Sequence, residues 1–370
     1  MSPAGWEPPP YPYDRLGPVR AKAAAWEGGV VDLSIGDPSD PPLPAVVAAL
    51  GSSGAERMYP TSVGSPSFRA AAAAWMERRL GVTVPVAQIG ACVGTKELVA
   101  GLPGWLKLRT PDRDTVLFPA VSYPTYAMGA TLAGCRAVPV AMDRQWRVDL
   151  ASIRPEDAAR AVCLWVNTPG NPAGGLDDLA AAAAWGRAHD VLVVSDECYV
   201  EFTWDGPPQT ILASGTEGVL AVHSLSKRSN LAGARSGFYA GDASLMAFLL
   251  EVRKHAGLMT PGPVLAAATV ALGDDDHVAV QRERYRQRLV RLQQIVAAMG
   301  VSVGLPGGGF YLWVGAPDGD DWGLVERLAA EAGVLGSPGE FYGDAGRGYV
   351  RLAAVASMEQ LDLAAARLGS

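Results

Sequence analysis

Cysteine and histidine are scarce in this chain, and their spacing excludes several kinds of site. The four cysteines are Cys92, Cys135, Cys163 and Cys198. No two of them have CxxC spacing, and a chain of 370 residues does not need disulfides, so we expect reduced thiols and a cytoplasmic location. The four histidines are His189, His223, His255 and His277. Their spacing matches no metal-ligand pattern, so we expect no bound metal.

Long apolar runs and an excess of positive charge are also missing. No stretch of about 18 apolar residues lacks charges and Gly/Pro breaks, so we predict no transmembrane helix. Residues 6–13 alternate proline with aromatics and have neither the basic nor the apolar region of a signal peptide. With 38 acidic against 31 basic residues, the net charge is −7, which is not the basic footprint of a nucleic-acid-binding protein. We therefore expect a protein that acts on small molecules.

What is present is a regular alternation of strand and helix patterns. From residue 88 onward, short Val-rich apolar runs are interleaved with helical segments, as expected for parallel strands buried on both faces. The expected strands span 89–93, 115–118, 136–140, 161–166, 191–195 and 219–223. The expected helices span 20–26, 45–50, 66–80, 98–106, 126–132 and 177–189. This order predicts an α/β fold around a mostly parallel sheet.

Two domains are expected, because 49% of the residues are hydrophobic and the pattern changes along the chain. Residues 245–299 are typical of long helices, and short strands and helices resume at 310–314, 324–332 and 349–352. We predict an N-terminal arm (1–45) that contributes to a small α+β domain (256–370), with a large domain (46–255) between them.

A lysine directly after a predicted strand is the strongest single candidate for chemistry. Ser224, Leu225 and Ser226 precede Lys227, and Arg235 follows it by eight residues. Such a turn brings an ammonium group to the carboxyl end of the sheet, where open α/β folds bind their ligands. Taken alone, the motif is equally compatible with a surface lysine in a loop.

Two further motifs follow other predicted strands. Residues 167–174 read Asn-Thr-Pro-Gly-Asn-Pro-Ala-Gly, a bent loop whose backbone could approach a ligand closely. Asp196 follows the strand at 191–195, where its carboxylate could pair with a cationic ligand atom, and Tyr199 could face the same pocket. By themselves, these motifs also fit a plain Pro/Gly loop and a helix N-cap at Asp196.

These three motifs occur together with five others in one order along the chain. The five are Ile35-Gly36-Asp37-Pro38, Tyr59-Pro60, Gly94-Thr95-Lys96, Tyr123-Pro124 and Arg351. In this order the chain resembles, from about residue 30 to its end, the fold-type I, class I/II aminotransferases that use pyridoxal 5′-phosphate. The resemblance implies an aspartate aminotransferase-like fold, with a three-layer αβα large domain, a mostly parallel seven-stranded sheet and a smaller α+β domain.

The resemblance implies catalytic roles for several residues. Lys227 would hold the cofactor as a Schiff base and shuttle the proton, and Asp196 would pair with the protonated pyridine nitrogen. Tyr199 and Asn171 would hydrogen-bond the 3-hydroxyl of the ring, and Tyr123 would stack on the ring face.

The phosphate and the substrate carboxylate have implied sites of their own. The residues implied for the phosphate are Gly94, Thr95, Lys96, Ser224, Ser226 and Arg235, with backbone N–H groups at a helix N-terminus. Arg351 would bind the substrate α-carboxylate as a bidentate fork, beside Gly36 and Asn171. Tyr59 would reach the cofactor phosphate of the neighbouring subunit, so the resemblance implies a homodimer with shared sites.

The reaction and the substrate leave alternatives open. The same cofactor supports a C–S β-lyase or a decarboxylase. A regulator carrying a DNA-binding domain is disfavoured, because the aminotransferase pattern begins by about residue 30. Residues 93–99 and 11–16 resemble the short actinobacterial N-succinyldiaminopimelate aminotransferases of lysine biosynthesis, which implies amino transfer from glutamate in making N-succinyl-LL-2,6-diaminopimelate. A broad aspartate, aromatic or glutamate transaminase is the alternative substrate class.

One departure from the family pattern lies beside the lysine. Many relatives carry an aromatic residue before the arginine, where this chain has Ala234. We expect this change to open space without altering the chemistry.

Overall fold

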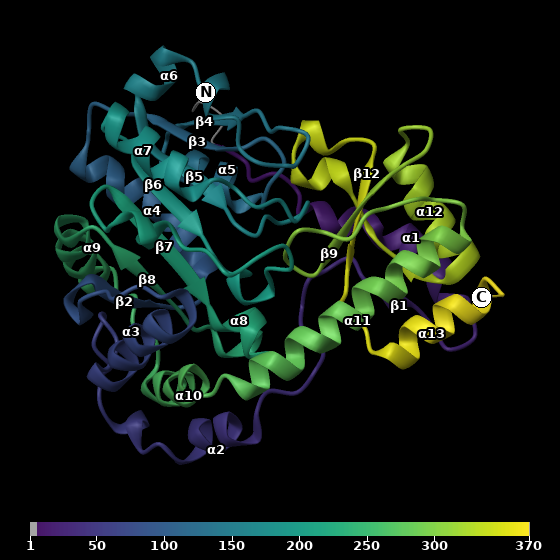
Figure 1. Cartoon of the computed structure of the whole chain (residues 1–370), viewed down its shortest axis with the longest axis horizontal. Coiled ribbons are helices and arrows are strands. Elements are labelled where there is room, and N and C mark those ends of the chain that lie inside the picture. Colours follow the sequence, from purple (N-terminus) through teal and green to yellow (C-terminus); the bar gives the residue numbers. More distant parts are fainter. Residues whose placement is uncertain (1–5, 370) are drawn as a thin grey trace, which may run out of the picture.

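Two sheets of different size organise the chain, one in each of the two lobes that Figure 1 shows. The computed structural model describes residues 6–369, so residues 1–5 of the predicted arm and Ser370 lie outside it. We call the lobe with the seven-stranded sheet the large lobe and the lobe with the three-stranded sheet the small lobe. Helix α11 (Asp276–Ala298) leads from the large lobe along the small one (Figure 1). The predicted domain boundaries stay a prediction.

The sheet of the large lobe has the strand order β2-β8-β7-β6-β5-β3-β4. Its strands are β2 (Ile89–Cys92), β3 (Thr115–Pro119), β4 (Arg136–Val140), β5 (Ala161–Asn167), β6 (Leu192–Asp196), β7 (Val219–Ser224) and β8 (Gly237–Gly241). Strands β4, β3, β5, β6 and β7 pair in parallel, and β8 runs antiparallel between β7 and β2. The predicted seven-stranded, mostly parallel sheet is confirmed. The sequence pattern does not predict β8, which has glycine at both ends.

Helices cover both faces of this sheet. The helices of the large lobe are α2 (Pro44–Ser52), α3 (Pro66–Leu80), α4 (Thr95–Arg109), α5 (Thr125–Leu132), α6 (Pro155–Ala159), α7 (Leu179–His189), α8 (Leu225–Arg228), α9 (Ala243–His255) and α10 (Gly262–Gly273). Strand β5 shows the layering, because Leu164 and Val166 belong to the core formed with α3, α7 and α10. Cys163 and Trp165 point to the opposite core, with α4, α5 and α9. The predicted three-layer αβα arrangement follows from this alternation.

The small lobe joins the two ends of the described chain. Its strands are β1 (Val31–Asp32), β9 (Tyr311–Gly315), β10 (Val334–Leu335), β11 (Ser337–Pro338) and β12 (Tyr349–Ala353). Its helices are the 3₁₀ turn η1 (Pro12–Leu16), α1 (Gly17–Ala24), α12 (Asp321–Ala332) and α13 (Met358–Arg367). Leu16, Val19 and Leu33 from the N-terminal arm are buried in the same core as Leu328 and Leu352. The arm is therefore part of the small lobe's packing.

The structure also bears on what we expected of the cysteines, of membrane-spanning helices and of His223. All four cysteines are free thiols, as expected, while the cytoplasmic location stays a prediction. Within residues 6–369, no helix is both long enough and apolar enough to cross a bilayer. His223 is buried, with its ring centroid 5.0 Å from that of Trp75 and 4.9 Å from that of Phe238. It is a core histidine.

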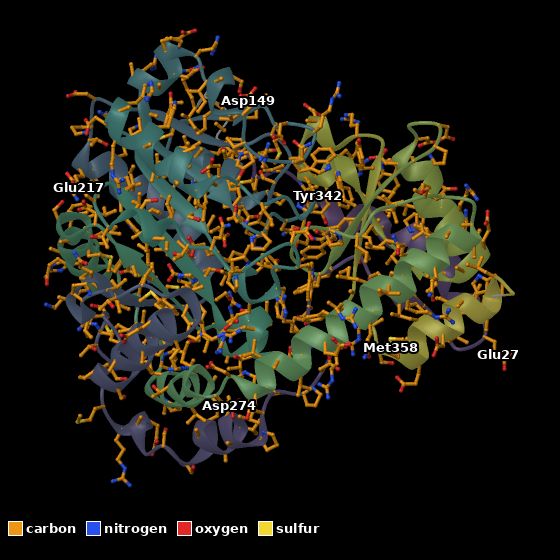
Figure 2. The ribbon with its side chains drawn as sticks, in the orientation of Figure 1. Glu27, Asp149, Glu217, Asp274, Tyr342 and Met358 are labelled. Carbon is orange, nitrogen blue, oxygen red and sulfur yellow. The ribbon has the colours of Figure 1, made fainter. Side chains whose placement is uncertain are left out.

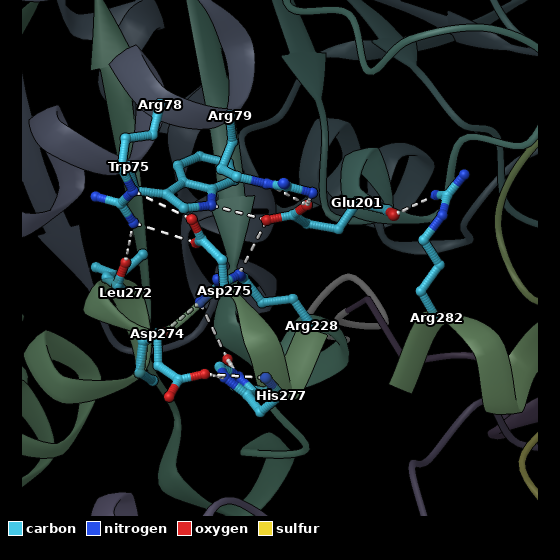
Figure 3. Close-up of polar contacts among 12 residues, drawn as sticks. Trp75, Arg78, Arg79, Glu201, Arg228, Leu272, Asp274, Asp275, His277 and Arg282 are labelled. Carbon is cyan, nitrogen blue, oxygen red and sulfur yellow. Dashed lines mark hydrogen bonds and ion pairs between the residues drawn. The ribbon is translucent and has the colours of Figure 1, made fainter. Parts of the chain in front are cut away.

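A buried carboxylate connects helix α3 to the helix that carries Lys227. Glu201, in the 3₁₀ turn η5 (Val200–Phe202), accepts hydrogen bonds from Trp75 Nε1 at 2.8 Å and from Arg79 Nη2 at 2.9 Å (Figure 3). Arg228 Nε lies 3.5 Å from the same carboxylate, and Arg228 is buried. Arg282, on α11, donates to the backbone carbonyl of Glu201 at 2.6 Å. Glu201 therefore joins three elements of the large lobe to α11.

Removing this carboxylate should destabilise the protein. Glu201→Ala leaves the buried guanidinium of Arg228 without its anion, which we expect to lower the free energy of unfolding by about 3 kcal/mol or more. Denaturant titration of the cofactor-free protein measures the change. The control is Glu217→Ala at the outer edge of the large lobe (Figure 2), where we expect a change of about 0.5 kcal/mol or less. Equal stability of the two variants would contradict a stabilising role for Glu201.

Candidate active site

A cavity of about 450 Å³ lies at the carboxyl edge of the large sheet, between the two lobes. Every predicted site residue except Gly94 and Tyr59 lines it. Those lining residues are Gly36, Thr95, Lys96, Tyr123, Asn171, Asp196, Tyr199, Ser224, Ser226, Lys227, Arg235 and Arg351. The convergence has a simple origin, because β5, β6 and β7 run in parallel and end at Asn167, Asp196 and Ser224. Parallel strands bring the residues that follow them to one edge.

One end of the cavity is built to bind an anion. Helix α4 begins at Thr95 after Gly94, and the first N–H groups of a helix have no partner within it. A Cβ at Gly94 would collide with the guanidinium of Arg235, so the arginine lies directly against this turn. Arg235 itself has a φ of 56°, a left-handed conformation that directs its backbone sharply at this point. Unpaired N–H groups, the helix dipole and an arginine together favour a phosphate.

A buried carboxylate forms the floor of the cavity. Asp196 ends β6, and its Oδ2 accepts a hydrogen bond from the hydroxyl of Tyr126 at 2.8 Å. Its Oδ1 accepts from the backbone N–H of Cys198 at 3.2 Å. Burial raises the pKa of Asp196, and no ion pair joins it to a cation within residues 6–369. A cationic ligand atom would compensate this burial, and the helix N-cap alternative does not apply because no helix begins here.

The predicted lysine points into the same cavity from helix α8. Its Nζ donates a hydrogen bond to the carbonyl oxygen of Gly36, from the loop that follows β1. Burial lowers the pKa of Lys227 to about 8. An amine with this pKa is uncharged far more often near neutral pH than an ordinary lysine, so Lys227 is suited to nucleophilic attack and proton transfer. The surface-lysine alternative is wrong.

A buried arginine faces the lysine from the small lobe. Arg351, on β12, donates from Nη1 to Asn171 Oδ1 at 2.9 Å and from Nη2 to the carbonyl of Ser34 at 2.6 Å. Its guanidinium lies 4.3 Å above the ring of Tyr311 and 4.7 Å from that of Tyr342. No carboxylate within residues 6–369 pairs with it. A buried cation without an anion is a natural site for a carboxylate ligand.

Four tyrosines that the sequence pattern does not assign to the site belong to its surroundings: Tyr13 and Tyr311 line the cavity, and Tyr126 and Tyr342 hydrogen-bond residues that line it. Tyr311 hydrogen-bonds Tyr199 between their hydroxyls at 2.8 Å and lies so close to Gly36 that a Cβ there would overlap the Tyr311 hydroxyl. Tyr13 bonds the hydroxyl of Tyr342 at 2.9 Å, where the two lobes meet (Figure 2). Tyr126, described above, is the fourth. Tyr126 and Tyr311 lie inside a predicted helix and a predicted strand, where they resemble ordinary core residues, and Tyr13 and Tyr342 lie outside the eight ordered motifs.

Tyr59 does not belong to this cavity. It lies in the loop after the 3₁₀ turn Ala55–Arg57, and 97% of its surface is exposed. Its neighbour Met58 is 82% exposed. Two adjacent, nearly bare apolar side chains on one loop are unusual for a surface with no partner.

The donor set fits pyridoxal 5′-phosphate, the cofactor that the resemblance implies. The start of α4 and Arg235 fit its phosphate, and Asp196 fits a protonated pyridine nitrogen. Tyr199 and the free amide Nδ2 of Asn171 fit the 3-hydroxyl, and Lys227 fits the aldehyde carbon. The charges and hydrogen-bond donors of the cavity therefore match the phosphate, the ring nitrogen, the 3-hydroxyl and the aldehyde of this cofactor.

Comparison with known proteins agrees with this fit. A family model described as aminotransferase class I and II matches residues 28–368. The chain is 42% identical to 4-dedimethylamino-4-oxo-anhydrotetracycline transaminase OxyQ of Streptomyces rimosus, over 98% of this chain and 99% of that protein.

Two solved structures are similar over nearly their whole length. One is described as a probable N-succinyldiaminopimelate aminotransferase from Thermus thermophilus. It has a TM-score of 0.86 and 30% identity, and the match covers 96% of this chain and 98% of that one. The other is a double mutant of Thermus thermophilus aspartate aminotransferase. It has a TM-score of 0.85 and 26% identity, and the match covers 98% of this chain and 96% of that one.

The lowered pKa of Lys227 predicts a distinct pH dependence. Only the uncharged amine attacks an aldehyde, so labelling of Lys227 in the cofactor-free protein should rise with pH through about 8 and level off above it. Labelling of a short lysine peptide added to the same sample, with an ordinary lysine pKa of about 10.4, should keep rising well above pH 8. Reductive trapping with a small aldehyde, followed by peptide mass spectrometry, measures both lysines in one sample. Identical midpoints would contradict the burial effect.

Proposed function

The chain belongs to the class I and II aminotransferases, and we propose that it moves an amino group between glutamate or 2-oxoglutarate and a substrate that carries a second carboxylate. The foremost candidate is N-succinyl-LL-2,6-diaminopimelate. The single observation that supports this class is a pair of cationic side chains, Arg351 and Lys96, that line one cavity without a carboxylate partner within residues 6–369.

Each residue of the cavity has a task in this reaction. Pyridoxal 5′-phosphate, when bound, supplies an electron sink for the charge that develops at the substrate α-carbon. Asp196 holds a proton on the ring nitrogen, and the hydrogen bond from Tyr126 keeps its carboxylate in place. Lys227 Nζ would take and carry the proton of the substrate α-carbon, because its pKa is near neutrality in a buried site. Tyr199 and Asn171 would hydrogen-bond the 3-hydroxyl oxygen of the cofactor ring.

The substrate is oriented by its two ends. Arg351 is held by Asn171 and Ser34 and presents its remaining donors to the α-carboxylate. Lys96 Nζ lies at the mouth, 5.9 Å from the ring centroid of Tyr11. A second carboxylate bound there would fix the direction of an extended substrate, which matches glutamate as well as N-succinyl-LL-2,6-diaminopimelate. The likeness to a structure described as a probable N-succinyldiaminopimelate aminotransferase supports this choice.

A second candidate substrate is a larger cyclic ketone. The relative with 42% identity is named for an anhydrotetracycline, which is a polycyclic compound. The cavity is also lined by Tyr11 and Tyr13, flat surfaces on which rings could pack. Comparing kcat/KM for N-succinyl-LL-2,6-diaminopimelate, oxaloacetate, phenylpyruvate and a polycyclic ketone separates these candidates, and release of pyruvate and ammonia would instead identify a β-lyase.

The two cations should differ in what they recognise. Lys96→Met should raise KM for glutamate about tenfold, the usual cost of one charged hydrogen bond, and leave KM for alanine nearly unchanged. Arg351→Lys should raise KM for both donors, because an ammonium cannot copy a planar fork on a carboxylate. Steady-state kinetics with the two donors measures this, and the cofactor absorbance band serves as the control for an intact site. An equal effect of Lys96→Met on both donors would contradict the second-carboxylate role.

We also propose a homodimer whose sites are shared. The surface of residues 47–59, where the large lobe begins along the chain, exposes three apolar side chains: Val47 on α2 at 50%, Met58 at 82% and Tyr59 at 97%. A second copy of the chain would cover this surface and receive Tyr59 at its own cofactor phosphate.

Subunit exchange tests the shared site. In a dimer of Tyr59→Ala with Lys227→Ala, both changes fall in one composite site and the other site is intact, so part of the activity should return on mixing the two impaired proteins. Sedimentation and activity are measured before and after exchange. Full activity of Tyr59→Ala alone, a monomer, or no recovery after verified exchange would each contradict the model.

A further inference from the structure

A negative charge lies in the first turn of the helix that fits the phosphate. Glu97 is the third residue of α4 and follows Lys96 directly. Its Oε1 reaches back to accept a hydrogen bond from the backbone N–H of Val93 at 2.9 Å, on the far side of Gly94. A carboxylate normally stabilises a helix N-terminus, but here it would repel a phosphate dianion bound to the same turn.

Arg253, on α9, compensates this charge. Its Nη2 lies 2.5 Å from Glu97 Oε1, and its Nη1 lies 3.1 Å from Oε2, so the guanidinium donates two hydrogen bonds to the carboxylate. The side chain of Arg253 is completely buried, and its guanidinium lies 5.1 Å from the ring of Trp105 and 5.4 Å from that of Tyr239. This cation has no other acidic partner within residues 6–369.

We propose that Arg253 is a positioning residue for the cofactor phosphate, acting through Glu97. It cancels the charge of Glu97 and holds that carboxylate on the N–H of Val93, so that the N–H groups of Thr95 and Lys96 remain open to the phosphate. The inference rests on the proposed placement of the phosphate at the start of α4.

A purely structural role makes a different prediction. If the pair only ties α9 to α4, its loss weakens binding of every ligand in the cavity to a similar extent. If it tunes the phosphate site, its loss acts on ligands that carry a phosphate. Pyridoxal, which lacks the phosphate, is the comparison ligand.

The experiment uses the cofactor-free protein and four variants. These are Arg253→Met, Glu97→Gln, the double variant, and Arg288→Met as the matched control. Arg288 is also buried and also grips one carboxylate with two donors, Asp40 at 2.6 and 2.8 Å, but neither residue lines the cavity. Methionine suits the apolar space between Trp105 and Tyr239, and Glu97→Gln retains an oxygen for the N–H of Val93. Dissociation constants for pyridoxal 5′-phosphate, pyridoxal and inorganic phosphate are measured by tryptophan fluorescence, together with the Tm of each variant.

We expect Arg253→Met to weaken the binding of ligands that carry a phosphate, and the added change Glu97→Gln to restore that binding. Arg253→Met should weaken binding of pyridoxal 5′-phosphate by about tenfold or more, comparable to losing an outer partner at a metal site, and binding of inorganic phosphate likewise. Pyridoxal should bind almost as before. The double variant, which has no net charge at this pair, should bind pyridoxal 5′-phosphate nearly as tightly as the unaltered protein. Arg288→Met should leave the ratio of the two dissociation constants unchanged whatever it does to Tm.

Three outcomes would overturn the proposal. These are an equal loss for both ligands in Arg253→Met, unchanged binding in that variant, and failure of the double variant to regain phosphate selectivity. If Arg253→Met does not fold, the double variant still decides, because the proposal requires it to prefer pyridoxal 5′-phosphate over pyridoxal as the unaltered protein does. Arg235→Met tests separately whether the phosphate binds at the start of α4. Unchanged selectivity for pyridoxal 5′-phosphate over pyridoxal in this variant would show that the phosphate does not bind there.

Discussion

The active site depends on one geometric constraint, the common direction of the strands in the large sheet. Parallel strands end together, so residues about 30 apart in sequence, such as Asn167 and Asp196, become neighbours in the sheet. Residues just beyond those ends are free of the ladder and can carry side chains that the core would not tolerate. Strand β8 runs the other way, and its place between β7 and β2 allows β2 to deliver Gly94 to the same edge.

Two buried charged residues of the cavity, one acidic and one basic, are not neutralised by partners of opposite charge in the described part of the chain. Asp196 is a buried anion without a cation, and Arg351 is a buried cation without an anion within residues 6–369. Several other buried charges in the molecule have a partner of opposite sign, as Glu201 has in Arg79 and Arg228 (Figure 3). Because an uncompensated buried charge is costly to keep, Asp196 and Arg351, which line one cavity, are natural sites for the charged groups of a ligand.

Much of this could be predicted from the sequence where a local rule applies. Helix α3 has its predicted limits because Ser65 caps it, Pro66 occupies its first turn and Gly81 adopts the left-handed conformation that ends it. Lys227, Asp196 and the loop at 167–174 were predictable from motifs that follow apolar runs, whereas Gly36, Tyr123 and Arg351 were implied by the family resemblance. Tyr311 was not, because its role comes from a hydroxyl that meets Tyr199 across 112 positions of sequence. Strand β8 was not predictable either, because nothing in its local sequence pattern indicates that it pairs between β7 and β2.

The pairing of β1 with β10 has a consequence for how the chain is made. Val31 lies beside Val334, so β1 pairs with a strand that is synthesised about 300 residues after it. The large sheet is complete once β8 has emerged, whereas Leu16, Val19 and Leu33 must wait for nearly the whole chain before their core exists. Sequence-distant contacts form slowly, and domains assemble in order of synthesis. The cavity residues that follow β5, β6 and β7 therefore emerge well before Arg351, on β12, which lines the cavity from the other lobe.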